Sequence, residues 1–502
     1  MLLEALLAVT FVSAFAVLLA PDEYAGRLAG ALSVLPLLGS LYAYATFDAS
    51  GNALLGGTPA FETTTQWVSL GPYTVDWHVG LDGLSLPLVL LTAVLATVAI
   101  VAAWDTVEER RSLFFALLLF TEASLFGVFS ALDFFVWFVF WEFVLVPMYL
   151  LVAVYGGPRR RYAAIKFFVY TNVASLVLFV GLMMLVVATP VQSFEFAALA
   201  DAIRAGSVQG MFGFSGGQLV AVAFFATLFG FAVKSAFVPF HTWLPDAYTE
   251  APTPVTLLLA GVVTKMGTYS LLRFNVTMFP DAWSQWALPL GLLAALTVLY
   301  GSFAALAQRD AKRLVAYTSI PSMGFVLLGL VAGTGYGVTG ATFQMVSHGL
   351  LVGALFLCVG YVEDATGTRM VAKVSGLADR LPVVAAVFVA AAFGYMGLPL
   401  MSGFAGEFLV FAGSFAAPYG GAPLVTAAAM FGIVVVAGIL LFLLQRVLMG
   451  PFEAPEGVGS VSRRDLAPAV VLVLLSILLG VAPELLTGAI RGAIGALVGG
   501  GL

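Results

Sequence analysis

Long apolar runs separated by short polar connections dominate this sequence. A run of about 20 apolar residues can cross the hydrocarbon core of a bilayer as a helix. The succession of such runs predicts fourteen spans, at residues 2–20, 28–46, 84–103, 112–130, 132–155, 161–188, 218–247, 252–274, 284–306, 313–332, 337–362, 382–416, 422–448 and 466–484. We therefore expect an all-α, polytopic membrane protein. Glu4 stands where a secretion signal carries basic residues, so the first run is expected to remain as a span.

The seventh and twelfth runs are over-long and interrupted. Pro239 and Pro245 break the seventh, and the stretch 397–403, with Gly397 and Pro399, breaks the twelfth. The two runs are five spans apart, an odd number, so the units that contain them would face opposite ways. Paired interrupted helices in inverted repeats mark transporter binding sites. The alternative is that Pro and Gly are simply frequent in membrane helices.

This pattern divides the chain into four parts. We expect three helices and an extracytoplasmic loop in 1–110, a first repeat of spans 4–8 in 111–280, a second repeat of spans 9–13 in 281–450, and a last helix and tail in 451–502. The longest polar stretch, 47–83, is rich in Thr, Gly and Pro and predicts a small hairpin.

Composition and charge support a membrane protein and set its orientation. The chain is 61% hydrophobic and 10% charged, whereas soluble domains carry about 25% charged residues. A net charge of -6 argues against nucleic acid as a partner. Of the 21 Lys and Arg residues, 15 fall in the odd-numbered loops, which are therefore expected to be cytoplasmic, with both termini outside. The single cysteine, Cys358, excludes an intramolecular disulfide, and no Cys or His cluster has metal-ligand spacing.

Three charged residues lie deep within predicted spans. Lys234 precedes the break of span seven, Lys265 is central in span eight, and Glu142 lies among aromatic residues in span five. A charge at this depth costs roughly 2.5–3.5 kcal/mol even on lenient scales. We expect these residues to be functional, against the alternative of a fixed ion pair or a structural hydrogen bond.

Other polar residues are more ambiguous. Lys166 follows three cytoplasmic arginines closely, so its amine could instead reach the membrane surface. His241 follows the break of span seven and could cap a helix end, and His348, central in span eleven, could be a satisfied core histidine. Together, Lys, Glu and His at mid-membrane depth suit protons better than bulky substrates. Movement of Glu142 relative to Lys234 would change whether the amine holds a proton.

At these residues the sequence resembles the antiporter-like membrane subunits of respiratory complex I, which are related to Mrp-type cation/proton antiporter subunits. The resemblance runs from residue 80 to residue 451. It is strongest in Trp141-Glu-Phe-Val-Leu-Val-Pro-Met-Tyr-Leu150, Pro239-Phe-His-Thr-Trp-Leu-Pro-Asp246, Glu250-Ala-Pro-Thr253, Leu259-Ala-Gly-Val-Val-Thr-Lys-Met-Gly-Thr268 and Phe343-Gln-Met-Val-Ser-His-Gly349.

The resemblance implies a fold with fourteen helices and two inverted five-helix repeats, and roles for individual residues. Glu142 and Lys234 would form the paired fifth- and seventh-span site, Lys265 the central group, and Glu407 the terminal group of span twelve. Glutamate rather than lysine at the last position is typical of the M-type (chain 4) subunit. Ser322 replaces a family histidine, so we expect ordered water to connect Lys265 with His348.

We therefore predict a proton-translocating, non-redox membrane subunit of a complex I-like NADH (or other donor):quinone oxidoreductase. The chain itself is expected to hold no cofactor, with flavin, iron–sulfur clusters and quinone on other subunits. Its partners would be other membrane subunits, further antiporter-like subunits among them, in the cytoplasmic membrane of a prokaryote. One alternative is a subunit of an Mrp-type sodium/proton antiporter. Another is a purely structural subunit of a membrane arm.

Overall fold

The computed structural model describes residues 1–455, 458–459 and 461–498, and most of them are helical. The helices, in chain order, are α1 (Leu2–Leu18), α2 (Asp22–Ala45), α3 (Leu86–Ala103), α4 (Arg111–Ser130), α5 (Phe134–Tyr155), α6 (Arg160–Ala188), α7 (Phe196–Arg204), α8 (Gly216–Lys234), α9 (Trp243–Glu250), α10 (Thr253–Leu258), α11 (Thr264–Ser270), α12 (Pro280–Gln285), α13 (Ala287–Leu306), α14 (Ala311–Ala332), α15 (Gly335–Thr366), α16 (Leu377–Arg380), α17 (Pro382–Tyr395), α18 (Ser402–Phe415), α19 (Ala422–Leu448), α20 (Arg463–Val481) and α21 (Glu484–Ile494). Short 3₁₀ turns are η1 (Ala53–Leu55), η2 (Phe240–Thr242) and η5 (Val371–Lys373), and π-helical turns are η3 (Leu259–Val263) and η4 (Leu271–Val276).

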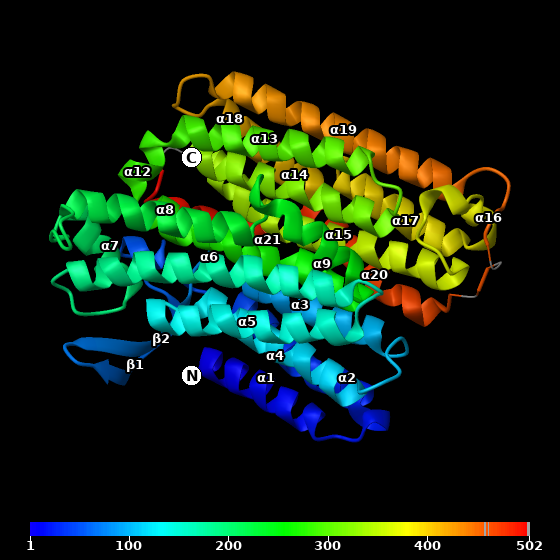
Figure 1. The fold of residues 1–502 in the computed structure, drawn as a ribbon, viewed down its shortest axis with the longest axis horizontal. Helices are drawn as coiled ribbons and strands as arrows, with labels where there is room; N and C mark the ends of the chain where they lie inside the picture. The colour runs from blue at the N-terminus through cyan, green and yellow to red at the C-terminus, as the bar shows by residue number, and fades with distance from the viewer. Residues whose placement is uncertain (456–457, 460, 499–502) are drawn as a thin grey trace.

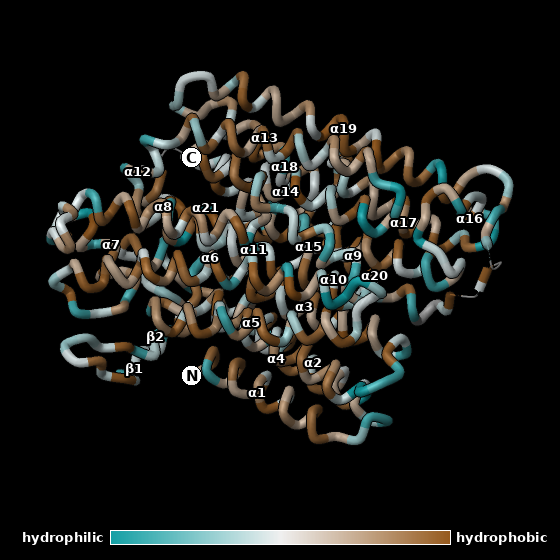
Figure 2. The backbone as a smooth tube through the Cα atoms, in the orientation of Figure 1, coloured by the Kyte–Doolittle hydropathy of each residue, from teal (hydrophilic) through white to brown (hydrophobic). Residues whose placement is uncertain are grey.

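The long helices run side by side in one bundle, with α1 and α19 at opposite edges (Figure 1). In the described part, eleven helical stretches are long and apolar enough to cross a membrane, or twelve if the bent pair α20 and α21 counts as one span. The remaining expected spans coincide with α1, which has 17 residues, and with α17 and α18, which have 14 each. Figure 2 shows hydrophobic residues along most of the helices and hydrophilic ones mainly on the connections at the two ends of the bundle.

Within the residues that the structure describes, one β-hairpin interrupts the helical architecture. Strands β1 (Ala60–Leu70) and β2 (Tyr73–Leu81) pair antiparallel, with Thr65 opposite Trp77. The turn between them contains Gly71, whose φ of +65° favours a residue without a Cβ. The hairpin predicted from the polar stretch is therefore confirmed, and the description of the fold as all-α is corrected by this one element.

The core of the bundle is formed by two segments that are buried along their whole apolar stretch. One is the continuous helical stretch Thr253–Val276, and the other is α15. Helix α15 packs against α14, α17, α18 and α20, and also against α3 and α10. It therefore joins the later part of the chain to the earlier part, and it brings its own polar residues to the centre of the molecule.

The two interrupted runs contain helix ends inside the bundle. Helix α8 ends at Lys234, and helical structure resumes with η2 and α9. Helix α17 ends at Tyr395, and α18 begins at Ser402 after a segment in which Leu400 has a φ of 71°. The end of a helix leaves backbone groups without regular helical partners, and at both interruptions turn hydrogen bonds take their place, such as Phe237 N–H to the Ala232 carbonyl and Leu398 N–H to that of Phe393.

Candidate functional site

Lys234, the last residue of α8, lies among aromatic rings. The residue is buried and only 2% exposed. The Nζ atom is 5.2 Å from the centre of the Trp141 ring and 5.8 Å from that of Phe167. Contacts of this kind favour a cation over the face of a ring. The amine is therefore stabilised by ring faces in this conformation, and no opposite charge among the described residues is in direct contact with it.

Glu142, on α5, lies near Lys234 without touching it. Within the described part of the chain, the two side chains form no ion pair within 4.0 Å, although their charges interact. The Glu142 Oε1 atom is buried and has no hydrogen-bond partner among the described residues. The structure thus brings the predicted pair together as neighbours but leaves a gap between them.

Lys265 and His348 are in direct contact at the centre of the bundle. Both residues are at most 1% exposed, and Lys265 Nζ is 2.5 Å from His348 Nδ1. The prediction that ordered water would connect these two residues is wrong, because α11 and α15 pack closely enough for the nitrogens to meet. The second ring nitrogen, Nε2 of His348, is buried without a partner among the described residues.

The π-helical turn η3 contributes polar backbone groups beside Lys265. Lys265 Nζ donates to the carbonyl oxygen of Ala260, and Tyr248 Oη donates to that of Leu259 at 3.0 Å. A π-turn widens the helix and frees carbonyl groups from the regular hydrogen-bond pattern, and such turns occur frequently at functional sites. The local backbone therefore holds the amine of Lys265 in an otherwise apolar interior.

Tyr395 connects this pair with Ser322. The rings of His348 and Tyr395 lie 5.6 Å apart, centre to centre. Tyr395 Oη donates to the carbonyl oxygen of Thr318 at 2.8 Å and is 3.0 Å from Ser322 Oγ. Ser322 thus lies beyond His348 in this series, next to Tyr395, and not between Lys265 and His348.

Glu407, on α18, lies at the next position along this polar series. The residue is 8% exposed. A Cβ added to Gly397 would stand 2.5 Å from Glu407 Oε2, so the carboxyl group packs against the interrupted backbone, where the φ of +76° at Gly397 favours glycine. Glu407, Tyr395 and Ser322 all line a cavity of about 10 Å³. A cavity of this size is close to the minimum that holds one water molecule.

Lys166 and His241 lie closer to one end of the bundle. Lys166 Nζ forms an ion pair with Asp246 Oδ2 at 2.8 Å, and Asp246 Oδ1 accepts from Arg313 Nη1 at 2.7 Å. His241 is 4% exposed and packs edge-on against the Tyr300 ring at 4.7 Å. Asp246 therefore joins α6, α9 and α14, and Lys166 has a fixed partner that sequence reasoning did not identify.

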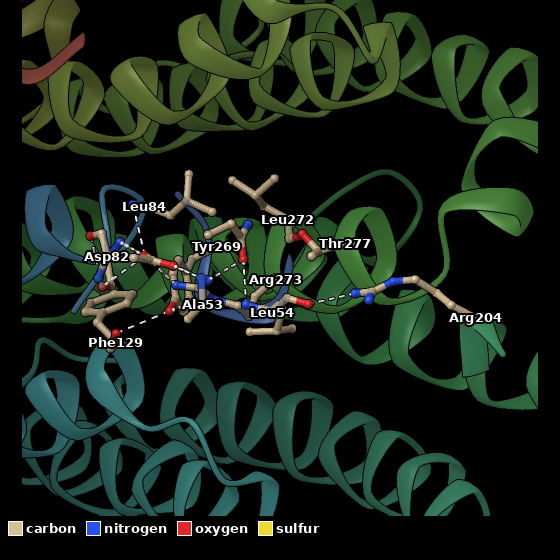
Figure 3. A network of polar contacts seen from close by, with 12 residues as sticks. Ala53, Leu54, Asp82, Leu84, Phe129, Arg204, Tyr269, Leu272, Arg273 and Thr277 are labelled. Carbon is tan, nitrogen blue, oxygen red and sulfur yellow. Dashed lines mark hydrogen bonds and ion pairs between the residues drawn. The ribbon is translucent and has the colours of Figure 1, made fainter. Parts of the chain in front are cut away.

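A second polar network lies at the C-terminal end of the buried helical stretch Thr253–Val276 (Figure 3). Arg273 donates to both carboxylate oxygens of Asp82, from Nη1 at 2.6 Å and from Nη2 at 2.7 Å. Its Nε donates to Tyr269 Oη at 3.1 Å, and Asp82 also accepts from the backbone N–H groups of Ala53 and Leu84. Both charged residues are 1% exposed. Every charge in this network has an opposite partner.

Several of these residues were missed in the sequence. Neither Lys312 nor Arg273 was singled out among the basic residues near span ends, yet they are 4% and 1% exposed. Tyr395 carries no charge and was not considered. Lys312 follows an N-cap, Asp310, whose side chain accepts from the Arg313 N–H, so its place in the first turn of a helix could have been recognised. The position of Tyr395, two residues before Gly397, was the other available signal.

Taken together, the series Lys265, His348, Tyr395, Ser322 and Glu407 consists of groups that can each accept and donate a proton. Lys265 and His348 are in direct contact, and Tyr395, Ser322 and Glu407 share one cavity. These groups lie near one another in an otherwise apolar interior, and His348 Nε2 is left without a hydrogen-bond partner among the described residues.

Comparisons with known proteins identify the family of this chain. Residues 131–435 match the family described as "NADH:quinone oxidoreductase/Mrp antiporter, TM". The chain is 37% identical over 463 residues to F(420)H(2) dehydrogenase subunit M of Methanosarcina mazei, covering 91% of this chain and 89% of that one. It is 38% identical over 492 residues to NADH-quinone oxidoreductase subunit M of Rhodobacter capsulatus, covering 95% and 91%.

Solved structures show the same fold. A chain of respiratory complex I from Thermus thermophilus matches with a TM-score of 0.85 at 29% identity, covering 100% of both chains. A chain of the Mrp complex from Dietzia matches with a TM-score of 0.84 at 22% identity, covering 99% of this chain and 97% of that one. The second match shows a shared fold alone.

Proposed function

Because the chain belongs to the NADH:quinone oxidoreductase/Mrp antiporter family of membrane subunits, we propose that it is a proton-translocating, M-type subunit of a complex I-like quinone oxidoreductase. The observation that carries this proposal is the direct contact of Lys265 with His348 in the fully buried centre of the bundle. Two titratable groups at this depth are costly to keep. A purely structural subunit would have no use for them.

The series of side chains supplies a route for the proton. The Lys265 ammonium donates from Nζ to Nδ1 of a neutral His348, and the histidine releases a proton from its other nitrogen, Nε2, to the hydroxyl of Tyr395. Because Nε2 has no partner in this conformation, that step requires the two side chains to move together. Tyr395 and Ser322 each accept one proton as they donate another, and the transfer ends on the Glu407 carboxylate. Water in the cavity of about 10 Å³ shared by these three residues completes the last step.

Glu142 and Lys234 act as the controlling pair in the earlier part of the chain. In this conformation the carboxylate and the amine interact without contact. Closer approach of Glu142 favours the protonated amine, and withdrawal favours release of the proton toward Lys265. Electron transfer elsewhere in the complex would drive this movement of Glu142. The movement would be transmitted through the interruption between α8 and α9, beside which Lys166 and His241 lie.

The membrane topology follows the same scheme. We infer fourteen spans, with α8 and α9 forming one interrupted span and α17 and α18 another. The two interrupted spans belong to inverted repeats in 111–280 and 281–450, between the parts 1–110 and 451–502. The arrangement of basic residues supports both termini on the outer face of a prokaryotic cytoplasmic membrane.

Redox chemistry would take place on other subunits. The proposed enzyme carries flavin, iron–sulfur clusters and quinone outside this chain, whose partners are other membrane subunits, among them further antiporter-like ones. The chain itself would contribute proton transfer and no electron transfer.

Purification through this chain tests the proposal against an Mrp-type antiporter. The proposal predicts that electron-transfer subunits co-purify, and that proton uptake into vesicles containing the complex requires an electron donor and a quinone. Proton movement driven by a sodium gradient without any electron donor, together with co-purification of antiporter subunits alone, would overturn it.

A further inference from the structure

A large acidic cavity opens near the ends of α3, α5 and α15. Its volume is about 800 Å³. Six carboxylic acids and two basic residues line it: Asp105, Glu108, Glu109, Glu363, Asp364, Asp465, Lys312 and Arg369. These residues lie in connections or at helix ends on the side that the distribution of basic residues assigns to the cytoplasm. The cavity therefore has an excess of groups that attract protons and other cations.

Lys312 is the basic residue at which this cavity meets the buried interior. It is 4% exposed, and its Nζ donates to the carbonyl oxygen of Ala251 at 2.6 Å. The charged groups acting on it are Glu363, Arg369, Asp310 and Glu250. Arg369 is bound in turn by Asp310 at 2.5 Å and by Glu250 and Glu363 at 3.8 and 3.9 Å. The Lys312 amine has no such direct carboxylate partner among the described residues.

We propose that Lys312 receives protons from this cavity and passes them toward Lys265. This inference rests on the proposed function, and it identifies Lys312 as the residue at which protons enter the buried route. Lysine suits the task because it can release its proton, whereas the neighbouring Arg369 remains charged in proteins.

A line of polar groups leads inward from Lys312. The Ala251 carbonyl, which follows the end of α9, also accepts from Thr256 Oγ1 at 3.2 Å. Thr256 Oγ1 lies 2.9 Å from the carbonyl oxygen of Tyr248, and Tyr248 Oη reaches η3 at Leu259. The next carbonyl, that of Ala260, accepts from Lys265.

The length of this line requires water as well as side chains. Thr256 and Lys265 are nine residues apart along one helical stretch, which corresponds to about 13 Å at 1.5 Å per residue. Carbonyl groups do not carry protons, but they orient water molecules, and the hydroxyl groups of Thr256 and Tyr248 relay protons between them.

Two substitutions of Lys312 separate proton transfer from a structural role. Arginine keeps the charge and can donate to Ala251, but it does not release a proton. Methionine removes both functions. The proposal predicts that Lys312→Arg and Lys312→Met lower proton pumping per quinone reduced alike, by nearly the whole share that this subunit contributes, because an essential acid–base group contributes roughly 10²–10⁴-fold in rate. A structural role predicts that arginine restores pumping.

The measurement uses the assembled complex in membranes, with the subunit quantified in each variant. Lys373→Arg is the matched control, since it makes the same substitution at an exposed lysine that does not line the cavity. Normal pumping by assembled Lys312→Arg would overturn the proposal, and this variant decides the question if Lys312→Met fails to assemble. Lys265→Met in the same assay tests the proposed function itself. Loss of pumping there with normal pumping in Lys312→Arg would reject only the entry point.

Discussion

The molecule buries positive charge in two different ways. At one end of the central stretch, Arg273 is 1% exposed and donates two hydrogen bonds to Asp82. At the end of α8, Lys234 is 2% exposed and faces aromatic rings, while Glu142 stays out of contact. The first charge is compensated in full, so the pair is fixed. The second is compensated in part, so its protonation can respond to a small movement.

This difference separates structural from functional charge. Breaking a fixed buried pair leaves an isolated charge and lowers stability strongly. Removing a partly compensated amine takes away a proton site with little effect on packing. The two regions should therefore respond in opposite ways to substitution, one in assembly and the other in pumping.

The largest effect is expected at Asp82. Asp82→Asn leaves the Arg273 guanidinium without an opposite charge and should destabilise the fold by about 3–5 kcal/mol. The amount of subunit in the membrane complex and its thermal unfolding midpoint measure this. Asp281→Asn, an exposed aspartate on α12, should change stability by less than about 0.5 kcal/mol.

Replacing both members of this pair sharpens the same point. Asp82→Leu combined with Arg273→Met should be less harmful than Asp82→Asn alone, since no isolated charge remains. Normal stability of the single variant would show that the pair is not the anchor we describe.

The next effect is expected at Lys234. Lys234→Ala should remove most of this subunit's proton pumping and leave the complex assembled, and Glu142→Gln should act similarly. The ratio of protons pumped to quinone reduced, in membranes with verified assembly, is the measurement. Lys373→Ala removes an exposed lysine and serves as the control. Loss of the whole complex in Lys234→Ala would place this residue with Arg273 as a structural charge.

A smaller and more specific effect is expected at Glu407. Glutamine keeps the shape of the side chain but does not titrate, so Glu407→Gln should impair pumping. Glu407→Lys should retain more activity than Glu407→Gln, because a lysine can still take up and release a proton. Equal and near-normal pumping in the glutamine variant would show that Glu407 only packs against Gly397.

The smallest effect concerns the hairpin. Burial lowers the pKa of His78, but Glu195 at 3.2 Å and Glu62 at 2.9 Å outweigh it, so the net pKa lies above the usual 6.5. A raised pKa stabilises the fold below about pH 6.5, and this contribution is lost as the pH rises through the folded-state value. Because Glu62 is 44% exposed, this contribution of His78 to stability should amount to less than about 1 kcal/mol.

Hydrogen exchange of the hairpin amides measures this contribution. Their protection, corrected for intrinsic exchange, should decline as the pH rises above about 6.5. His78→Gln should remove the pH dependence. The same decline in the glutamine variant would assign it to another group.

Much of the fold could be predicted from the sequence, because apolar runs of membrane length leave few alternatives. The burial of Lys234, Lys265 and His348 could be predicted for the same reason, since a polar residue within such a run is conspicuous. Lys312 and Arg273 were misjudged because they lie near the ends of apolar runs. Their burial depends on α10, α15 and the hairpin, which are distant in sequence.

Contacts between helices were the least predictable feature. Ser322 was expected near Lys265 and His348, but its hydroxyl lies 3.0 Å from that of Tyr395, the last residue of α17. The direct contact of Lys265 with His348 depends on how closely α11 and α15 approach. Neither the rotation nor the spacing of helices follows from an apolar pattern that surrounds each helix on all sides.

The proton-to-electron ratio of the assembled complex carrying Lys265→Met tests the central claim most directly. Methionine is similar in length to lysine and apolar, so it should fill the buried position and remove the proton site that contacts His348. We predict that the ratio falls by the share that this subunit contributes, while the subunit remains in the complex. An unchanged ratio in the assembled variant would contradict the account.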